Sequence, residues 1–216
     1  MKALDFWFDP VSPYAWLAFQ RLPEAFAGLS YTVSYRPIVF AALLKHYAHK
    51  GPAEIEPKRA WTFRQVHWLA QRHGIAMQTP AQHPFNPLAL LRLAYACAGL
   101  GGQPNRHVCA AIFEHVWQGG GADANDPERV AMLTQRLAPA RDPASEAVKL
   151  ALKEATAHAI ALGVFGVPTL GCENRLFWGF DALDMVADAL RGDAWFEAGG
   201  AWEREGAPRA GVVRGR

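Results

Sequence analysis

Apolar residues in the first part of the chain follow two different periods. Residues 3–8 form a short aromatic-rich run that is typical of a buried strand. Ser12 and Pro13 then suit the N-cap and the first position of a helix, and apolar residues recur on one helical face as far as Gly28. Residues 31–36 alternate between apolar and polar, which predicts a second strand. The chain therefore opens with a predicted β-α-β unit.

Helical patterns dominate the middle of the chain, from about residue 57 to residue 163, and strand patterns are almost absent there. Asp126 and Asp142 each precede a proline, a pairing that marks two helix starts. Residues 143–162 are a long alanine-rich stretch that predicts one helix, which Gly163 closes. A block of helices therefore follows the β-α-β unit.

Strand patterns return near the C-terminal end. Residues 167–170 and 176–178 are predicted strands, and Asp181 is predicted to cap a final helix through Leu190. The order β-α-β, helices, β-β-α is that of an α/β thioredoxin-like fold with an inserted all-helical domain. We expect three parts, namely a split thioredoxin-like domain (residues 1–45 and 160–192), a helical insertion (residues 46–159) and a loose or irregular tail (residues 193–216).

Composition and charge exclude several classes of function. The chain has 216 residues, of which 51% are hydrophobic and 19% charged, and its formal net charge is +2. Such a composition supports a packed core and excludes global disorder, while the small net charge does not indicate nucleic-acid or membrane-surface binding. The first residues lack a signal-peptide core, and no apolar run approaches the roughly 18 to 20 residues that span a bilayer. We expect a cytoplasmic protein whose partners are neither nucleic acids nor membranes.

The cysteines and histidines do not form a recognisable redox or metal motif. Cys97, Cys109 and Cys172 are widely spaced, and the absence of a CxxC pair excludes a disulfide oxidoreductase centre and a four-cysteine zinc site. His46 and His49 are three residues apart, but no third ligand follows at a suitable spacing, and HExxH is absent. We therefore expect no metal site. Nucleotide and serine-hydrolase chemistry also have no support, because the Walker loop, GxGxxG and GxSxG are missing.

Ser12 is the first candidate for chemistry. A hydroxyl at a helix start lies near free backbone N–H groups and the positive end of the helix dipole, which together stabilise an anion such as the thiolate of a bound ligand. The alternative is that Ser12 is only an N-cap, which contributes about 1 kcal/mol. The two roles are compatible.

Two further segments carry candidate binding groups. Pro168 either has a cis peptide bond that turns the Val167 backbone toward an extended peptide, or is a trans proline at a strand edge. Asp181 is either a plain N-cap or a carboxylate that holds the amino group of a small zwitterionic ligand. The local pattern leaves both pairs of alternatives open.

Several motifs, taken in order, resemble one family. Residues 5–18 read DFWFDPVSPYAWLA, and the most specific later matches are residues 164–169 (VFGVPT) and the segment from Trp178 to Leu183. Shorter matches lie between them, at residues 51–53, 57–59, 83–88 and 113–117. This ordered set extends from residue 3 to about residue 190. It resembles the 2-hydroxychromene-2-carboxylate isomerases and their relatives, the kappa-class glutathione transferases.

The resemblance implies a DsbA-like thioredoxin fold with a helical insertion, a homodimer, and glutathione as cofactor. It implies that Ser12 stands where thioredoxin relatives carry their reactive cysteine and that Ser12 holds the glutathione sulfur as a thiolate. It further implies that Val167, before a cis Pro168, pairs with the cysteinyl backbone of glutathione. The γ-glutamyl group is expected at four adjacent residues, Trp178, Gly179, Phe180 and Asp181.

The activity that the resemblance implies is a glutathione-dependent isomerisation in aromatic-compound catabolism. The thiolate would add to ring-opened 2-hydroxychromene-2-carboxylate, permit rotation about the resulting single bond, and leave to give trans-o-hydroxybenzylidenepyruvate. Ser12 is the expected catalytic residue, because it lowers the thiol pKa. The substrate carboxylate needs a cationic or amide partner. The candidates for this partner are Lys45, His49, Lys58 and Asn86.

The chain also departs from the family pattern inside the expected pocket. The departures are His49, Trp61, Gln65, Trp68, Phe180 and Ala182. They spare the scaffold but leave the electrophilic substrate open. Two alternatives therefore stand beside the isomerase. One is a kappa-like glutathione transferase that acts on other electrophiles, and the other is a non-catalytic thioredoxin-like module that binds peptides at the Pro168 edge.

Overall fold

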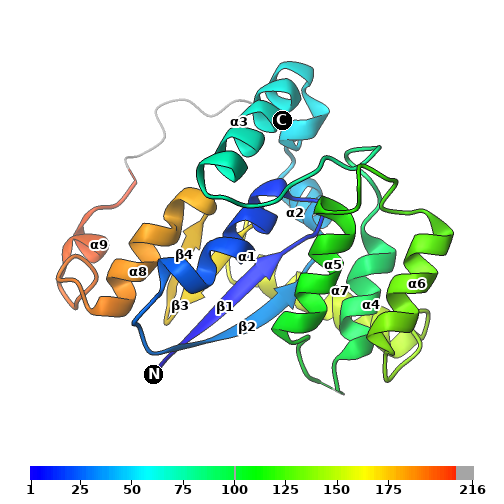
Figure 1. Cartoon of the computed structure of the whole chain (residues 1–216). Coiled ribbons are helices and arrows are strands. Elements are labelled where there is room, and N and C mark those ends of the chain that lie inside the picture. Colours follow the sequence, from blue (N-terminus) through cyan, green and yellow to red (C-terminus); the bar gives the residue numbers. More distant parts are fainter. Residues whose placement is uncertain (100, 208–216) are drawn as a thin grey trace.

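Strands from residues 2–37 and from residues 169–178 form one mixed four-stranded sheet. The structure is a computed structural model that describes residues 1–99 and 101–207. The strand order is β2-β1-β3-β4. β1 (Lys2–Phe8) pairs in parallel with β2 (Tyr31–Pro37) and antiparallel with β3 (Thr169–Cys172), and β3 pairs antiparallel with β4 (Arg175–Trp178). The predicted β-α-β and β-β-α units are therefore both present. They meet at the centre of the sheet, where β1 of the first unit pairs with β3 of the second (Figure 1).

Alternation along β1 directs apolar side chains to both faces of the sheet. Its even-numbered residues Leu4, Phe6 and Phe8 join the large core cluster that includes residues of α1 (Pro13–Ala25) and α8 (Leu183–Arg191). Trp7 points to the opposite face and clusters with residues of α2 (Phe40–His46) and α7 (Glu146–Ala161). Helices consequently cover both faces, as Figure 1 shows.

Every regular element described between β2 and β3 is helical, which confirms the pattern seen in the sequence. These elements are α2, η1 (Pro52–Glu54), α3 (Glu56–Arg72), α4 (Leu88–Cys97), α5 (Arg106–Trp117), α6 (Pro127–Leu137) and α7. Phe113 of α5 lies 5.0 Å from the ring of Phe8 and 5.8 Å from that of Trp16, between ring centroids. The helical segment and the sheet therefore share one aromatic core.

Two of the predicted helix starts behave differently. Asp126 accepts a hydrogen bond from the Arg129 N–H at 2.9 Å and caps α6, as predicted. Asp142 accepts from the Ala144 N–H at 2.8 Å, which closes a short turn, and α7 begins only at Glu146 with Ser145 at its N-cap position. The predicted start at residue 143 is wrong because the Asp-Pro pair also satisfies a local turn.

The interpretation of Asp181 as the N-cap of the last helix is also wrong. Phe180–Ala182 form a 3-10 turn, η2, and α8 starts at Leu183 without a side-chain cap. Asp181 therefore lies inside the turn, and its carboxylate is exposed instead of being used by the helix. The predicted strand at residues 167–170 likewise starts two residues later, because β3 begins after Pro168.

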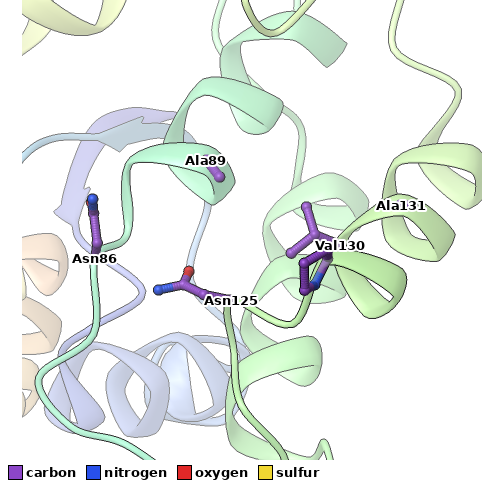
Figure 2. A pocket seen from close by; sticks show the side chains of 6 residues that line it. Asn86, Ala89, Asn125, Val130 and Ala131 are labelled. Carbon is purple, nitrogen blue, oxygen red and sulfur yellow. The ribbon is translucent and has the colours of Figure 1, made fainter.

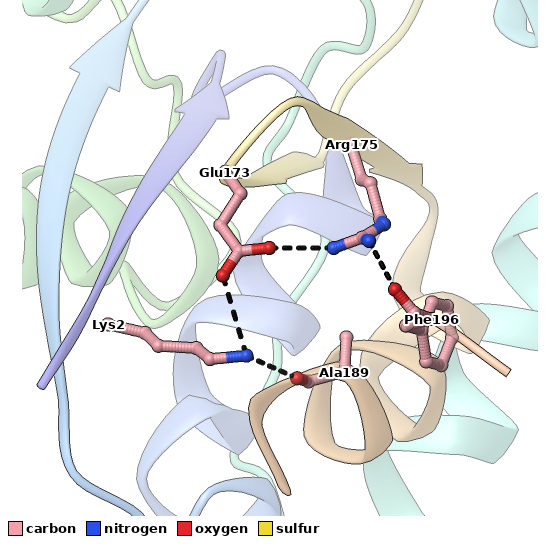
Figure 3. Close-up of polar contacts among 5 residues, drawn as sticks. All are labelled: Lys2, Glu173, Arg175, Ala189 and Phe196. Atoms are coloured by element: carbon pink, nitrogen blue, oxygen red, sulfur yellow. Dashed lines mark hydrogen bonds and ion pairs between the residues drawn. The ribbon is translucent and has the colours of Figure 1, made fainter. Parts of the chain in front are cut away.

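The tail beyond α8 is packed as far as the structure describes it. Phe196 is buried, and the ring of Trp202, in α9 (Ala201–Arg204), lies 5.2 Å from that of Phe177 in β4. Arg175 bonds to the Phe196 carbonyl (Figure 3). Phe196 and Trp202 therefore anchor the segment after α8 against β4, and residues 208–216 of the predicted tail lie outside the described part.

The same close-up shows how the N-terminus is held. Lys2 donates to the Ala189 carbonyl at 2.8 Å and lies 3.5 Å from Glu173, which also pairs with Arg175 at 2.7 Å (Figure 3). Lys2 thus links β1 to the end of α8 and to the β3–β4 turn. Among the described ranges, no helix is both long and apolar enough to cross a membrane.

Candidate functional site

Ser12 is buried at the junction of β1 and α1, with 7% of its surface exposed. Its hydroxyl oxygen accepts a hydrogen bond from the Ala15 N–H at 3.2 Å, so the predicted N-cap role is confirmed. The same hydroxyl donates to the Val167 carbonyl oxygen at 3.2 Å. The start of α1 thereby contacts the loop that precedes β3.

The loop before β3 has the geometry that the sequence left open. The peptide bond between Val167 and Pro168 is cis. The Pro168 carbonyl accepts from the Gly179 N–H at 2.9 Å, and Thr169 pairs with Trp178 in the β3–β4 ladder. No backbone carbonyl among the described residues accepts from the Val167 N–H. The Val167 segment is therefore joined to Ser12 through a direct hydrogen bond, and the segment of Gly179 is joined to that loop through Pro168.

Trp178 lies on the backbone of this loop. A Cβ added at Gly166 would overlap the indole nitrogen of Trp178, so the close approach depends on a glycine at position 166. Trp178 is 56% exposed, and its ring lies 4.9 Å from that of Phe165, which is also exposed. An uncovered aromatic pair thus flanks the cis proline.

Asp181 lies near the first turn of α1. Burial raises the pKa of Tyr14, and the charge of Asp181 raises it further, which indicates that the two side chains are close. Gly179 adopts a positive φ of 103°, and a Cβ there would overlap the Asp181 carboxylate. Phe180 packs edge-on against His73, with ring centroids 5.5 Å apart. The η2 turn that carries Asp181 therefore packs against α1, the helix that Ser12 caps.

Helix α3 is held over α1 by one of the departures from the family pattern. Gln65 accepts a hydrogen bond from the Tyr14 hydroxyl at 2.6 Å. Trp61 and Trp68, on the same helix, are 62% and 55% exposed, and the Arg72 guanidinium lies 5.4 Å from the Trp68 ring. Gln65 is therefore a structural contact of the site, whereas the two tryptophans face outward.

Asp9 is a part of the site that the sequence analysis missed. It is fully buried, and its two carboxylate oxygens accept from the Val11 and Phe40 N–H groups, each at 3.0 Å. Burial raises its pKa to about 7. Asp9 thereby ties the loop of Ser12 to the start of α2. Its position between Phe8 and Pro10 in an apolar run was the available signal.

His83 is a second buried polar group that was missed. Its Nε2 lies 2.8 Å from the Val11 carbonyl oxygen, so Nε2 carries the proton in this pairing. Its Nδ1 is buried and has no partner among the described residues. Burial lowers the pKa of His83 and favours the neutral ring. The hydrogen bond from His83 thus fixes the Val11 carbonyl, in the residue before Ser12.

The four candidates for the substrate carboxylate are more dispersed. Lys45 in α2, His49 after it, and Lys58 in the first turn of α3 are exposed, and none of them forms a described hydrogen bond or ion pair with Ser12. Asn86 uses its Oδ1 to accept from the Leu88 N–H at 3.1 Å. It lines a groove of about 500 Å³ that Asn125 also borders and that contains no other candidate residue (Figure 2).

The cysteines and metal-binding residue types do not extend the site. Burial raises the pKa of Cys97, Cys109 and Cys172, so all three favour the unreactive thiol. Within residues 1–99 and 101–207, no group of three His, Cys, Asp or Glu side chains is placed to hold a metal ion.

Comparisons with known proteins agree with this architecture. The family model described as a DSBA-like thioredoxin domain matches residues 3–191. A 2-hydroxychromene-2-carboxylate isomerase of Pseudomonas putida is 29% identical over 196 residues, which cover 87% of this chain and 93% of the relative. Glutathione S-transferase kappa 1 of Rattus norvegicus is 22% identical, with 90% and 92% covered. A solved 2-hydroxychromene-2-carboxylate isomerase superposes with a TM-score of 0.75 at 26% identity, covering 88% of this chain and 95% of that one.

Proposed function

The chain belongs to the DsbA-like thioredoxin family, and from this premise we propose that it is a glutathione-dependent isomerase of 2-hydroxychromene-2-carboxylate or a similar aromatic carboxylate. Three relatives support an isomerase or transferase of the glutathione-related branch: the Pseudomonas enzyme, the rat kappa transferase and the solved isomerase. The absence of a CxxC pair separates the chain from dithiol oxidoreductases of the same fold.

The observation that carries the proposal is the hydroxyl of Ser12 at the N-terminus of α1. Its oxygen accepts the Ala15 N–H, which polarises the O–H bond and makes it a better donor. A glutathione thiolate beside it would gain that hydrogen bond and the favourable field of the helix start. Both effects favour the charged form of the thiol and lower its pKa. Ser12 acts in this scheme without forming a covalent bond.

Binding of glutathione would exchange one hydrogen bond for three. The single proton of the Ser12 hydroxyl is now donated to the Val167 carbonyl. When the hydroxyl turns toward a thiolate, the Val167 carbonyl becomes free to accept from the cysteinyl N–H of glutathione. The Val167 N–H can donate to the cysteinyl carbonyl at the same time. Asp181, with Trp178, Gly179 and Phe180 around it, would hold the γ-glutamyl amino group.

The bound thiolate would act as a reversible nucleophile. Its sulfur forms a bond to one carbon of the conjugated carbon–carbon double bond. The π-electron pair of that double bond moves into the adjoining carbonyl system. The remaining single bond rotates. The electron pair then returns, the carbon–sulfur bond breaks, and the trans double bond and the thiolate are both regenerated. The step consumes no oxidant or reductant.

A partner for the substrate carboxylate completes the proposed site. Lys45, His49 and Lys58 come from the segment between α2 and α3, and Asn86 comes from the loop before α4. We assign this role to the set because each offers a cationic or amide donor. The exposed Lys45, His49 and Lys58 remain able to turn toward a ligand, while Asn86 would donate through its Nδ2 and keep the Leu88 N–H on its Oδ1.

A kappa-like glutathione transferase is the second candidate, favoured by the rat relative. It would use the same thiolate and would keep the carbon–sulfur bond instead of breaking it.

We also propose that the protein works as a homodimer in the cytoplasm. Sedimentation of the purified chain tests the dimer, since a single species at twice the mass of 23.7 kDa is expected.

The direct test is turnover of 2-hydroxychromene-2-carboxylate, followed by absorbance with and without glutathione. We expect conversion only when glutathione is present, and a loss of about a hundredfold in kcat for Ser12→Ala, the scale seen when one charge-stabilising donor is removed. A thioether product in place of the trans isomer would support the transferase. No reaction of glutathione with any aromatic carboxylate or electrophile would contradict both enzymes and leave the peptide-binding module.

A further inference from the structure

A second cavity lies between α2, α4 and α7, away from Ser12. It has a volume of about 370 Å³, within the range of small-molecule sites. We call it the basic groove and define it by six of its lining residues, namely Leu88, Arg92, Lys149, Lys153, Ala157 and Ile160. Neither Ser12 nor any other candidate residue of the proposed glutathione site lines it.

The sequence of α7 accounts for the shape of the basic groove. Lys149, Lys153, Ala157 and Ile160 follow one another at intervals of four, four and three residues, so they lie along one face of the helix. This face is about 16 Å long at the rise of an α-helix. The first two positions are cationic and the last two are apolar. One side of the groove is therefore amphipathic along its length.

Arg92 of α4 adds a third cation at the charged end. Arg92 and Lys149 both lower the pKa of Glu146, at the start of α7, so the guanidinium lies at the same end as Lys149. Glu146 pairs with Lys149 at 2.7 Å, and it is 89% exposed in its side chain. Three cations and one carboxylate leave an excess of two positive charges there.

Some polar side chains that line the groove have all their hydrogen-bond partners within the protein, and others do not. Thr156 accepts from the Val39 N–H and donates to the Leu152 carbonyl, so it is saturated within the protein. The Arg92 Nε is buried and has no hydrogen-bond partner among the described residues, and neither Arg92 nor Lys153 forms an ion pair there. No described carboxylate therefore competes with a bound anion for Arg92 or Lys153, both of which line the groove.

We propose that the basic groove binds an amphipathic monoanion, a carboxylate or sulfonate attached to an apolar chain. The anionic group contacts Arg92, Lys149 and Lys153, and the apolar chain lies along Ala157 and Ile160 toward α2. Charge complementarity selects the head group, and the apolar half of the groove selects the chain. The inference does not depend on the proposed isomerase activity, because the two sites share no residue.

Calorimetric titration with octanoate tests the proposal, with octanamide and acetate as probes that lack the charge and the chain. Octanoate is expected to bind with one-to-one stoichiometry, at least about tenfold more tightly than either control probe. Its affinity is expected to fall on raising the salt concentration, because an ion pair at a partly exposed site is screened. Equal affinity for octanoate and octanamide would overturn the proposal.

Variants locate the binding. Lys153→Gln is expected to weaken octanoate binding about fivefold, and Ala157→Trp, at an exposed helix position, to abolish it by filling the apolar half. Lys50→Gln, which removes an exposed cation from the loop after α2, serves as the matched control and is expected to change nothing. Octanoate binding that survives Ala157→Trp would place the ligand elsewhere and overturn the proposal. So would conversion of a dimer to a monomer by Ala157→Trp, since a second copy would then cover the groove.

Discussion

The Ser12 hydroxyl donates to the Val167 carbonyl at 3.2 Å, although the two residues are 155 positions apart in the chain. The bond connects the start of α1 with the loop before β3, and both segments are set by the pairing of β1 with β3. A rigid sheet thus brings a hydroxyl, a free N–H group and a carbonyl to one point. An anion bound at this point would gain the hydroxyl as a donor once the hydroxyl turns away from the Val167 carbonyl.

Replacing Ser12 tests its structural and chemical roles together. Ser12→Ala removes the acceptor of the Ala15 N–H, so we expect the free energy of unfolding to fall by about 1 kcal/mol. The affinity for glutathione should change little, whereas the pKa of the bound thiol should rise because the donor to the thiolate is lost. Chemical denaturation and the ultraviolet absorbance of the thiolate as a function of pH measure the two effects.

Ser145→Ala is the matched control for that experiment. Ser145 occupies the N-cap position of α7, but its side chain makes no capping bond and its hydroxyl oxygen is buried without a partner among the described residues. Its removal should therefore leave stability unchanged or slightly improved. If Ser12→Ala and Ser145→Ala were equally harmless, the hydrogen bonds assigned to Ser12 would have no energetic role.

Asp9 predicts an unusual dependence of stability on pH. Its pKa is about 7 in the folded protein against 3.8 for an ordinary aspartate, so the folded state holds the proton more tightly than the unfolded state. The contribution of Asp9 to stability is therefore lost as pH rises through about 7 and is recovered as pH falls toward 4. Relative to Asp9→Asn, the parent should gain about 2 to 3 kcal/mol between pH 8 and pH 5.

Denaturation of both proteins across that pH range checks the prediction. Asp9→Asn keeps the size of the side chain and cannot ionise, so the difference between the two curves isolates the carboxyl group from other titrating groups, such as His83. A constant difference from pH 8 to pH 5 would show that Asp9 does not titrate in this window.

Gly166 and Trp178 should be energetically coupled. Gly166→Ala places a Cβ on the indole of Trp178, and the resulting overpacking is expected to cost about 1 to 3 kcal/mol and to weaken glutathione binding. Trp178→Ala removes the overlap, so the double variant should be more stable than the two single effects predict when added. Gly99→Ala, where a Cβ meets nothing within 4 Å, is the control. Additive effects in the double-variant cycle would contradict the contact.

Two helix starts could be predicted from the residues immediately around them in the sequence. Ser12 before Pro13 and Asp126 before Pro127 are caps whose partners lie within three residues, and both were identified. Asp142 also precedes a proline, and Asp181 precedes a predicted helix, yet Asp142 closes a turn and Asp181 lies inside η2. A short polar side chain near a helix start can satisfy several local geometries, and packing of the next residues decides among them.

Long-range relationships were not accessible from local patterns. The contact between Ser12 and Val167 requires the strand order of the sheet, and only the resemblance of ordered motifs grouped the two residues in advance. The burial of Phe196 against β4 depends on tertiary packing of a segment that has little local preference. The role of Asp9 depends on the Phe40 N–H, which comes from a different element.

The central claim is that Ser12, Val167 and Asp181 form one glutathione site, and calorimetric titration with glutathione tests it most directly. The parent is expected to bind one glutathione per chain in the millimolar range or below. Asp181→Ala should weaken binding by about tenfold or more through loss of a charged partner, whereas Asp184→Ala, an exposed acidic residue in the next turn, should not. Absence of binding to the parent at millimolar glutathione, or equal losses in the two variants, would contradict the account.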